Sequence, residues 1–395
     1  MTSVESTSQL SAEKIIARAS SATGLDDMGT TGFEDRLNAM VDYAAAHPDL
    51  DDDALPVFVE ELESLVRFRL RFEHDRHATP AIAAERIERP IIVAGSPRSG
   101  TTVLHALIAQ DPKARTPRAW EVTYPSPPPS LASPDDPRRE QATRMIKDWC
   151  LRAPGMFLAH PYWDEWAEAP MECESFLTLD LHNTYPTWFP YTPAFIDFNT
   201  APTPESVRDG YRWHHAMLQQ LQWGGSDQHW VLKGTSHQFS LDVVLDTYPD
   251  ASVVWIHRNP VEVFASFMEL MAVLVEGMSG RAIDRRSIGP QFLQRWGDGL
   301  MNGISKPVVD DPRVHHVLYA DFIADPPGEV GRLFDRMGRN LSDDHDQLMR
   351  SWLASPANRP NRHGKFTYEL DWFGLTQAQV RERFADYVDR FDIPG

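Results

Sequence analysis

The chain has 395 residues, of which 42 % are apolar and 24 % charged, an ordinary balance for a globular protein of one large domain or two. Its formal net charge of −19 argues against general nucleic-acid binding and against adhesion to an anionic membrane. Two cysteines, a polar N-terminus and no apolar stretch of membrane-spanning length lead us to expect a cytoplasmic protein without a disulfide framework or an integral membrane span.

The predicted elements begin with a helical block. Residues 1–85 are interpreted as an N-terminal helical extension, in which Ser11 can cap a first helix and later apolar residues recur at helical spacing. Residues 86–395 are interpreted as the main domain. It opens with the apolar strand IIVAG, a loop and the helix TTVLHALIAQ. A proline-rich loop then leads into a helical and aromatic insertion over about 125–225, where Thr203 and Pro204 are typical of a helix start.

Short apolar strands alternate with helices after the insertion. The patterns HWVLKG, ASVVWIHR and VHHVLYADF predict strands, and a helical pattern follows each of them. This alternation predicts an α/β fold with a parallel sheet flanked by helices. At the C-terminus, Thr376 and Gln379 form a capping-box pattern that opens one amphipathic helix, QAQVRERFADYVDRF.

The loop GSPRSGTT has the layout of a phosphate-binding loop between a strand and a helix. Gly95, Gly100 and Thr102 occupy the glycine and hydroxyl positions of the pattern G-x-x-x-x-G-K-[ST]. Thr101 replaces the usual lysine, and Arg98 places a cation inside the loop instead. Backbone N–H groups at such a turn and the positive end of the helix bind anions.

The following strands end in cations rather than in carboxylates. Lys233 ends one predicted strand and Arg258 the next, where a nucleoside-triphosphate enzyme normally needs an acidic residue to organise Mg²⁺. A transferred group with less negative charge than a terminal phosphoryl, such as a sulfuryl group, requires less neutralisation by metal. We therefore expect no metal.

Three segments resemble one known family. GSPRSGTT is similar to the 5′-phosphosulfate loop of sulfotransferases that use 3′-phosphoadenosine 5′-phosphosulfate (PAPS), and HRNPVEVFASF to their 3′-phosphate segment. YADFIADP resembles a third family stretch, and the order along the chain agrees over roughly residues 88–395. The resemblance, to a bacterial type of the family, implies a P-loop-like fold, PAPS as donor and 3′,5′-bisphosphoadenosine (PAP) as product.

The resemblance also implies which residues contact the donor. Asn259 and Pro260 favour a helix start directly after Arg258, which independently places that arginine above a helix N-terminus. The expected donor-binding residues are Ser96, Pro97, Arg98, Ser99, Gly100, Thr101 and Thr102 in the loop, Arg258 and Ser266 at the 3′-phosphate, and Arg362, His363 and Lys365 in a basic C-terminal loop.

The expected catalytic residues are Arg98, Lys233 and a general base that the sequence leaves open. Lys233 would stabilise the bridging oxygen as the sulfuryl group leaves. Glu172, in a Pro-x-Glu-Cys pattern, is favoured as the base over His237, which lies four residues after Lys233, and over Glu121. Pro170 is expected to start a helix in this segment. The neighbouring Glu168 and Glu174 fit solvated positions at a helix start better than Glu172 does.

Aromatic and methionine-rich segments suggest the acceptor. The stretches WDEWAEAP, YPTWFPYTPAFIDF and FMELMAVLVEGM would give an apolar cleft if they line one, which favours a small lipophilic alcohol or phenol as acceptor. Two other interpretations remain open: a P-loop kinase and a non-catalytic nucleotide-binding protein. A homodimer is possible on this sequence.

Overall fold

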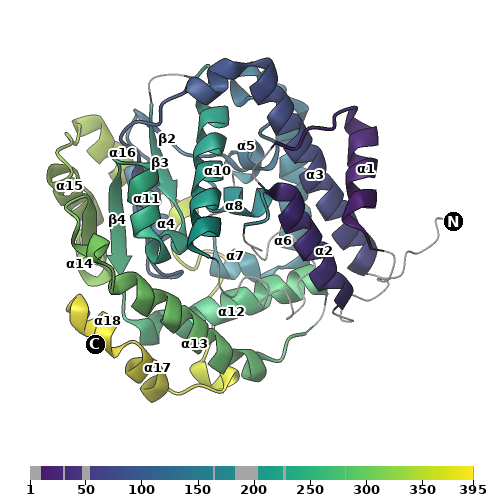
Figure 1. The fold of residues 1–395 in the computed structure, drawn as a ribbon. Coiled ribbons are helices and arrows are strands. Elements are labelled where there is room, and N and C mark those ends of the chain that lie inside the picture. Colours follow the sequence, from purple (N-terminus) through teal and green to yellow (C-terminus); the bar gives the residue numbers. More distant parts are fainter. Residues whose placement is uncertain are drawn as a thin grey trace.

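Five parallel strands form the centre of the fold in the computed structural model, which describes residues 10–29, 32–46, 54–162, 165–182, 203–225, 228–280 and 282–394 (Figure 1). Their order across the sheet is β2-β3-β1-β4-β5. The strands are β1 (Ile91–Ala94), β2 (Ala114–Arg115), β3 (His229–Lys233), β4 (Ser252–His257) and β5 (Val314–Leu318). This arrangement confirms the predicted α/β class.

Strand β1 lies between β3 and β4, so its apolar residues are buried on both faces. Val93 pairs in register with Lys233 on one side and with Val254 on the other. Because all the strands run parallel, the loop after β1 and the ends of β3 and β4 meet at one edge of the sheet. The predicted loop and the two predicted strand-end cations are therefore neighbours.

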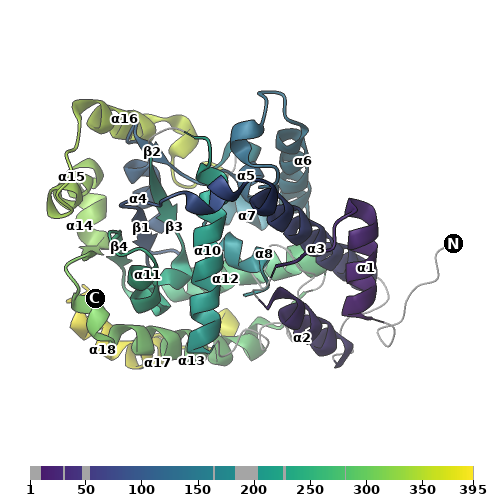
Figure 2. The ribbon, with the colours of Figure 1, turned by 45° about the horizontal axis from the view of Figure 1, so that its top comes forward.

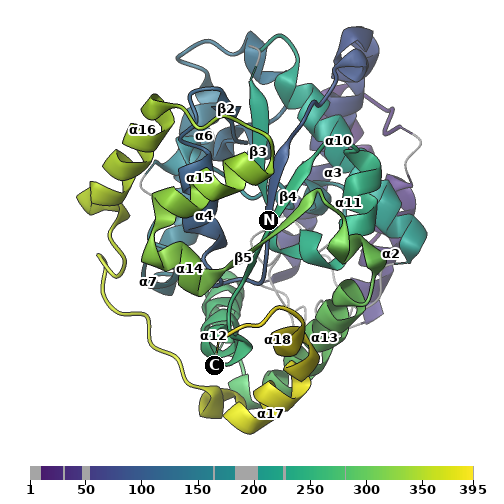
Figure 3. The same cartoon turned by 90° about the vertical axis from the view of Figure 1, so that its left-hand side faces the viewer.

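Helices cover both faces of the sheet (Figure 3). Ile91 and Val93 face a core shared with α4, α15 and α16, whereas Ile92 and Ala94 face the larger core shared with α10 and α11. In the described residues, the α-helices after β1 are α4 (Thr101–Ile108), α5 (Ala119–Thr123), α6 (Pro137–Arg152), α7 (Gly155–Ala159), α8 (Ser175–Leu179), α10 (Pro204–Gln222), α11 (Leu241–Thr247), α12 (Pro260–Ser279), α13 (Arg285–Ile304), α14 (Tyr319–Ala324), α15 (Pro326–Arg336), α16 (Asp343–Ala354), α17 (Gln377–Arg383) and α18 (Ala385–Arg390).

The N-terminal helices α1 (Ala12–Thr23), α2 (Phe33–Ala46) and α3 (Ala54–Ala78) lie together on one side of the molecule (Figure 2). Their buried apolar residues belong to the same core as those of α10 and α11. Arg69 of α3 donates to Asp180, just after α8, at 2.7 Å, and neither side chain is exposed. The N-terminal helices are thus joined to α8, α10 and α11 by apolar packing and by a buried ion pair.

Three local predictions were wrong. Strand β5 ends at Leu318 because its partner β4 ends opposite it at His257, and Tyr319 already starts α14. Pro170 starts no helix: residues 169–171 pair with the chain at 117–119, which keeps them extended, and α8 begins at Ser175. The C-terminal helix is divided into α17 and α18 at Phe384, although its capping box is present.

Two expectations on apolar segments have different outcomes. The aromatic stretch at 185–198 lies entirely outside the described residues. The methionine-rich part of α12 contributes mainly to the core, where Met268, Leu274 and Val275 are buried. Within the described ranges, no helix combines the length and apolarity needed to cross a bilayer.

Candidate active site

The loop between β1 and α4 has a backbone that depends on its two glycines. Gly95 has φ +144°, and a Cβ there would lie 2.6 Å from the carbonyl oxygen of Ile256 on β4. Gly100, at the start of α4, has φ +97°, and a Cβ there would lie 3.0 Å from the ring of Tyr319. Side chains at these positions would therefore force the loop away from the sheet edge. Ser99 donates its hydroxyl to the carbonyl of Ser96 at 2.6 Å, which closes the turn.

Arg98 connects the loop to the predicted 3′-phosphate segment. Its Nε donates to Ser266 Oγ at 3.0 Å, and its Nη1 donates to the carbonyl of Ala159. Arg258 in turn donates from Nη1 to the carbonyl oxygen of Arg98 at 3.2 Å. Arg98 in the loop, Arg258 at the end of β4 and Ser266 in α12 thus lie together, and all three are residues expected from the sequence to contact PAPS.

Arg258 borders a cavity of about 280 Å³. Its guanidinium lies 4.1 Å from the ring centroid of Tyr319 and pairs with Glu262 at 2.9 Å. Asn259 caps α12, as predicted, by accepting from the backbone N–H of Val261. The cap and the cation together make this edge of the cavity suitable for an anion.

Lys233 lies at the centre of a second group of contacts. Its ammonium pairs with Glu172 and donates to Thr102 Oγ1 at 3.3 Å. Lys233 is 4 % exposed, whereas the side chain of Glu172 is 22 % exposed. The backbone N–H of Cys173 donates to the carbonyl of Lys233 at 2.9 Å, so the Glu172 segment runs along the end of β3. Glu172 is thereby placed against the lysine and within reach of solvent.

Glu172 and Glu174 have opposite pKa shifts. Burial would raise the pKa of Glu172, but the Lys233 charge and hydrogen bonds from Glu174 and Lys233 outweigh it and hold the pKa below its usual range. Burial, followed by the charge of Glu172, raises the pKa of Glu174. Glu174 is 1 % exposed and accepts hydrogen bonds from Thr235 and from the N–H and hydroxyl of Ser236. The interpretation of Glu174 as a solvated acid was wrong.

The other two candidate bases are engaged elsewhere. His237 is fully buried, and its ring nitrogens contact Tyr211 Oη at 2.7 Å and Cys173 Sγ at 3.1 Å. Glu121 is 7 % exposed and binds the guanidinium of Arg115 and the backbone N–H of Arg118 at the start of α5. Of the three candidates, the geometry therefore favours Glu172.

His160 belongs to this site and was missed by the sequence reasoning. Its Nε2 lies 3.5 Å from Thr102 Oγ1. Burial, with a further contribution from Lys233, lowers its pKa to about 3, so the ring is neutral at physiological pH. His160 follows α7 within the long insertion, and no pattern in the sequence distinguishes it from other histidines.

The basic C-terminal loop lies near the site, but its three cations differ. Arg362 donates from Nε to the carbonyl of Pro161 at 3.0 Å, and the ring of His363 lies 5.5 Å from that of Phe157. Lys365 is exposed. Phe366, which sequence reasoning did not select, lies with its ring centroid 5.8 Å from the Arg98 guanidinium.

Comparison with known proteins identifies relatives along most of the chain. A family model described as "Sulfotransferase family" matches residues 90–343. The chain is 25 % identical over 308 residues to ω-hydroxy-β-dihydromenaquinone-9 sulfotransferases of Mycobacterium bovis and Mycobacterium tuberculosis, an alignment that covers 76 % of this chain and 74 % of each relative.

Two solved structures are similar over nearly the whole chain. Sulfotransferase STF1 from Mycobacterium tuberculosis has a TM-score of 0.77 at 28 % identity, covering 95 % of this chain and 98 % of that one. Sulfotransferase STF9 from Mycobacterium avium has a TM-score of 0.80 at 25 % identity, covering 98 % of this chain and 97 % of that one. Coverage this high means that most of the N-terminal helical block is aligned as well.

Proposed function

Because the chain belongs to the sulfotransferase family, we propose that it moves a sulfuryl group from PAPS to a hydroxyl group of a small lipophilic acceptor. The observation that carries the proposal is one edge of the sheet where two groups of contacts meet. Arg98, Ser266 and Arg258 form the first group, and Thr102, Lys233 and Glu172 form the second. The first group has the cations and the hydroxyl needed to bind the phosphates of PAPS, and the second has a carboxylate and an ammonium that could assist transfer of the sulfuryl group.

The donor would lie along the loop after β1. Backbone N–H groups of the loop, which Pro97 lacks, and the side chain of Arg98 would hold the 5′-phosphosulfate at the N-terminus of α4. Arg258 and Ser266 would hold the 3′-phosphate beside the cavity at the end of β4. The basic loop at 362–365 would close over this part of the donor.

The transfer requires a base and a stabilised leaving group. The acceptor oxygen attacks sulfur, the bond from sulfur to the 5′-phosphate oxygen breaks, and PAP leaves. Glu172 takes the acceptor proton, and the Lys233 ammonium stabilises the negative charge on the departing oxygen. The hydrogen bond from the Cys173 N–H to the Lys233 carbonyl holds the two segments side by side, which supports this assignment.

The acceptor class is proposed from similarity. The curated relatives act, by their names, on an ω-hydroxylated dihydromenaquinone, which is a lipophilic alcohol. We propose an acceptor of the same chemical class, an apolar alcohol or phenol, with the enzyme acting in the cytoplasm and without nucleic acid. The possible homodimer can be tested by light scattering of the purified protein.

The test is an acceptor screen with a defined donor. The enzyme is incubated with PAPS and long-chain alcohols, phenols or a lipid extract, and the products are measured by mass spectrometry together with released PAP. Sulfated product and PAP should appear in equal amounts. Transfer from ATP in place of PAPS would support the kinase, and nucleotide binding without any transfer would support the non-catalytic interpretation.

A further inference from the structure

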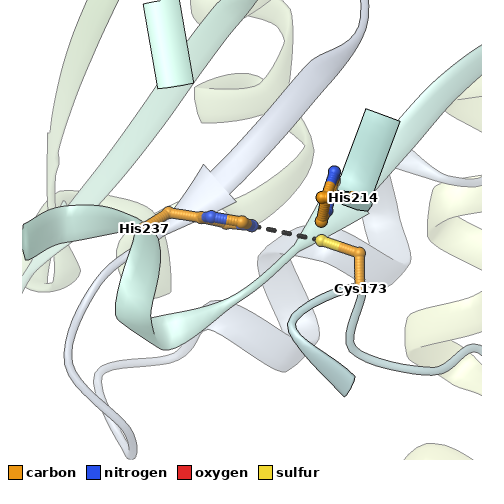
Figure 4. Close-up of side chains that lie close together, drawn as sticks. All are labelled: Cys173, His214 and His237. Carbon is orange, nitrogen blue, oxygen red and sulfur yellow. Dashed lines mark hydrogen bonds between the residues drawn. The ribbon is translucent and has the colours of Figure 1, made fainter. Parts of the chain in front are cut away.

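A cluster of sulfur and nitrogen donors lies in the core behind the proposed active site. Cys173 precedes α8, His214 lies on α10, and His237 lies in the short 3-10 helix η5 (Thr235–Phe239). Their side chains converge from these three elements (Figure 4). One donor atom from each lies within 4.8 Å of the other two, and all three residues are fully buried. The mechanism above uses none of these side chains.

The two histidines are held in the same way. Tyr211 Oη lies 2.7 Å from Nδ1 of His237, and Tyr248 Oη lies 2.6 Å from Nδ1 of His214. In metal sites, a hydrogen bond at one ring nitrogen of a histidine fixes the orientation of the ring and leaves the other nitrogen to bind the metal. In both rings this leaves Nε2 as the nitrogen available to a ligand.

Hydrogen bonding alone satisfies His237 but not His214. The Nε2 of His237 lies 3.1 Å from Cys173 Sγ, so both nitrogens of that ring have partners. The Nε2 of His214 has no hydrogen-bond partner among the described residues, although the side chain is completely buried. A buried polar atom without a partner is uncommon and calls for a ligand or another explanation.

From this cluster we infer that Cys173, His214 and His237 bind a divalent metal ion of the zinc type. One thiolate and two imidazoles are ligands that zinc prefers, and Co²⁺ can replace zinc in such sites. Zinc–ligand bonds of about 2.0–2.3 Å separate the ligand atoms by roughly 3.4–3.6 Å. Here Cys173 Sγ and His237 Nε2 lie 3.1 Å apart and no pair of ligand atoms is more than 4.8 Å apart, so side-chain shifts of about 1 Å suffice.

The charge of the site also fits. Binding displaces the thiol proton of Cys173 to solvent, and the resulting thiolate neutralises one of the two positive charges of the ion. The fourth position of a tetrahedral site would be taken by water or another donor, since no further His, Cys, Asp or Glu joins the group among the described residues. From the sequence we expected no metal, on the ground that a sulfuryl group requires less neutralisation by Mg²⁺ during transfer. The inferred ion departs from that expectation, and it would not contact the transferred group.

The ion would hold together the two segments that carry the proposed base and lysine. Cys173 directly follows Glu172, and His237 lies on the turn that follows Lys233. Gly234, which directly follows Lys233, packs against the ring of His237: a Cβ at this position would lie 2.7 Å from His237 Nε2. A metal at this point would fix the distance between Glu172 and Lys233 without contacting substrate, which is a structural role.

The first test uses the wild-type protein and needs no variant. The protein is expressed with added zinc, passed through a desalting column, and measured by inductively coupled plasma mass spectrometry. We expect about one zinc per chain. Replacing zinc by Co²⁺ should give the absorption bands of cobalt bound to thiolate, and removing the metal with a chelator should lower Tm. Substoichiometric metal, with no cobalt bands and no change in Tm, would overturn the assignment.

Variants then assign the ligands, each with a matched control. Cys173→Ser and His214→Gln should abolish the cobalt bands and reduce bound zinc at least tenfold. Cys150→Ser, at the other buried cysteine, and His215→Gln, at the adjacent histidine on α10, should retain both. If Cys173→Ser or His214→Gln retains wild-type metal content, these residues are not the ligands. If a variant does not fold, the wild-type cobalt spectrum still decides whether a thiolate binds the metal.

Discussion

Replacing Glu172 by glutamine separates the proposed base from the structural roles of its segment. Glutamine has the same size and keeps a hydrogen-bonding oxygen towards Lys233, but it cannot accept the acceptor proton. Loss of a positioned general base lowers turnover by about 10²–10⁴-fold. At about 1.36 kcal/mol per factor of ten, this corresponds to about 2.7–5.4 kcal/mol in activation free energy. The variant Glu172→Gln should therefore retain little transfer activity.

Donor affinity should respond differently. Glu172 competes with any incoming anion for the Lys233 ammonium, to which it is paired in the structure. The glutamine variant removes that competitor, so PAP should bind as tightly as to the wild type or more tightly. The assay is a set of initial rates at saturating PAPS, with PAP affinity measured separately by calorimetry.

A neighbouring acid provides the control. Glu168 lies in the same segment, its side chain is 45 % exposed and it pairs with Arg139, so Glu168→Gln should leave both kcat and PAP affinity near wild-type values. A near-wild-type kcat for Glu172→Gln would refute its role as base. Loss of PAP binding together with turnover would show instead that Glu172 maintains the shape of the donor site.

Three further predictions test other parts of the structure. Arg258→Ala should weaken PAP binding by ~2 kcal/mol, about 30-fold, with little effect on AMP, and equal affinity of the wild type for PAP and AMP in calorimetry would contradict a 3′-phosphate site. Transfer rates should be the same with and without added Mg²⁺, and a strict requirement would point back to a kinase. Asp180→Ala should lower the free energy of unfolding in urea by about 3 kcal/mol, because the buried Arg69 and its neighbour Arg36 both lose the carboxylate that they share. The control Asp298→Ala removes a 65 % exposed partner and should cost less than about 1 kcal/mol.

The sequence predicted the elements that carry the proposed donor-binding residues, because those residues occupy regular positions. A strand, a glycine-containing turn and a helix locate Arg98, and the ends of two later predicted strands, β3 and β4 in the structure, locate Lys233 and Arg258. In a parallel sheet these points meet at one edge, so periodicity and chain order were sufficient to bring them together. The resemblance to a known family added the identity of the expected donor.

The insertion could not be predicted in the same way. Its segments pack against the sheet edge through individual contacts, such as the Cys173 N–H to the carbonyl of Lys233, and no repeating pattern encodes these. That contact places Glu174 against the turn after β3, where Ser236 binds its carboxylate, so a residue expected in solvent is buried. His160 is brought to Thr102 by the fold of the same insertion.

Arg258, Arg98 and Lys233 are held by partners of different strength, which bears on how the proposed site would divide donor binding from catalysis. Arg258 pairs with Glu262, whose side chain is 51 % exposed, and an exposed pair is worth little, so a 3′-phosphate can replace it at small cost. Arg98 contacts neutral acceptors, Ser266 and a backbone carbonyl, which an anion readily displaces. Lys233 is nearly buried against a carboxylate, so drawing it towards the donor costs more and leaves Glu172 without its counter-ion. Affinity should therefore come mainly from the two arginines, and movement of Lys233 towards the leaving oxygen would raise the basicity of Glu172 at the point where the acceptor proton must be taken.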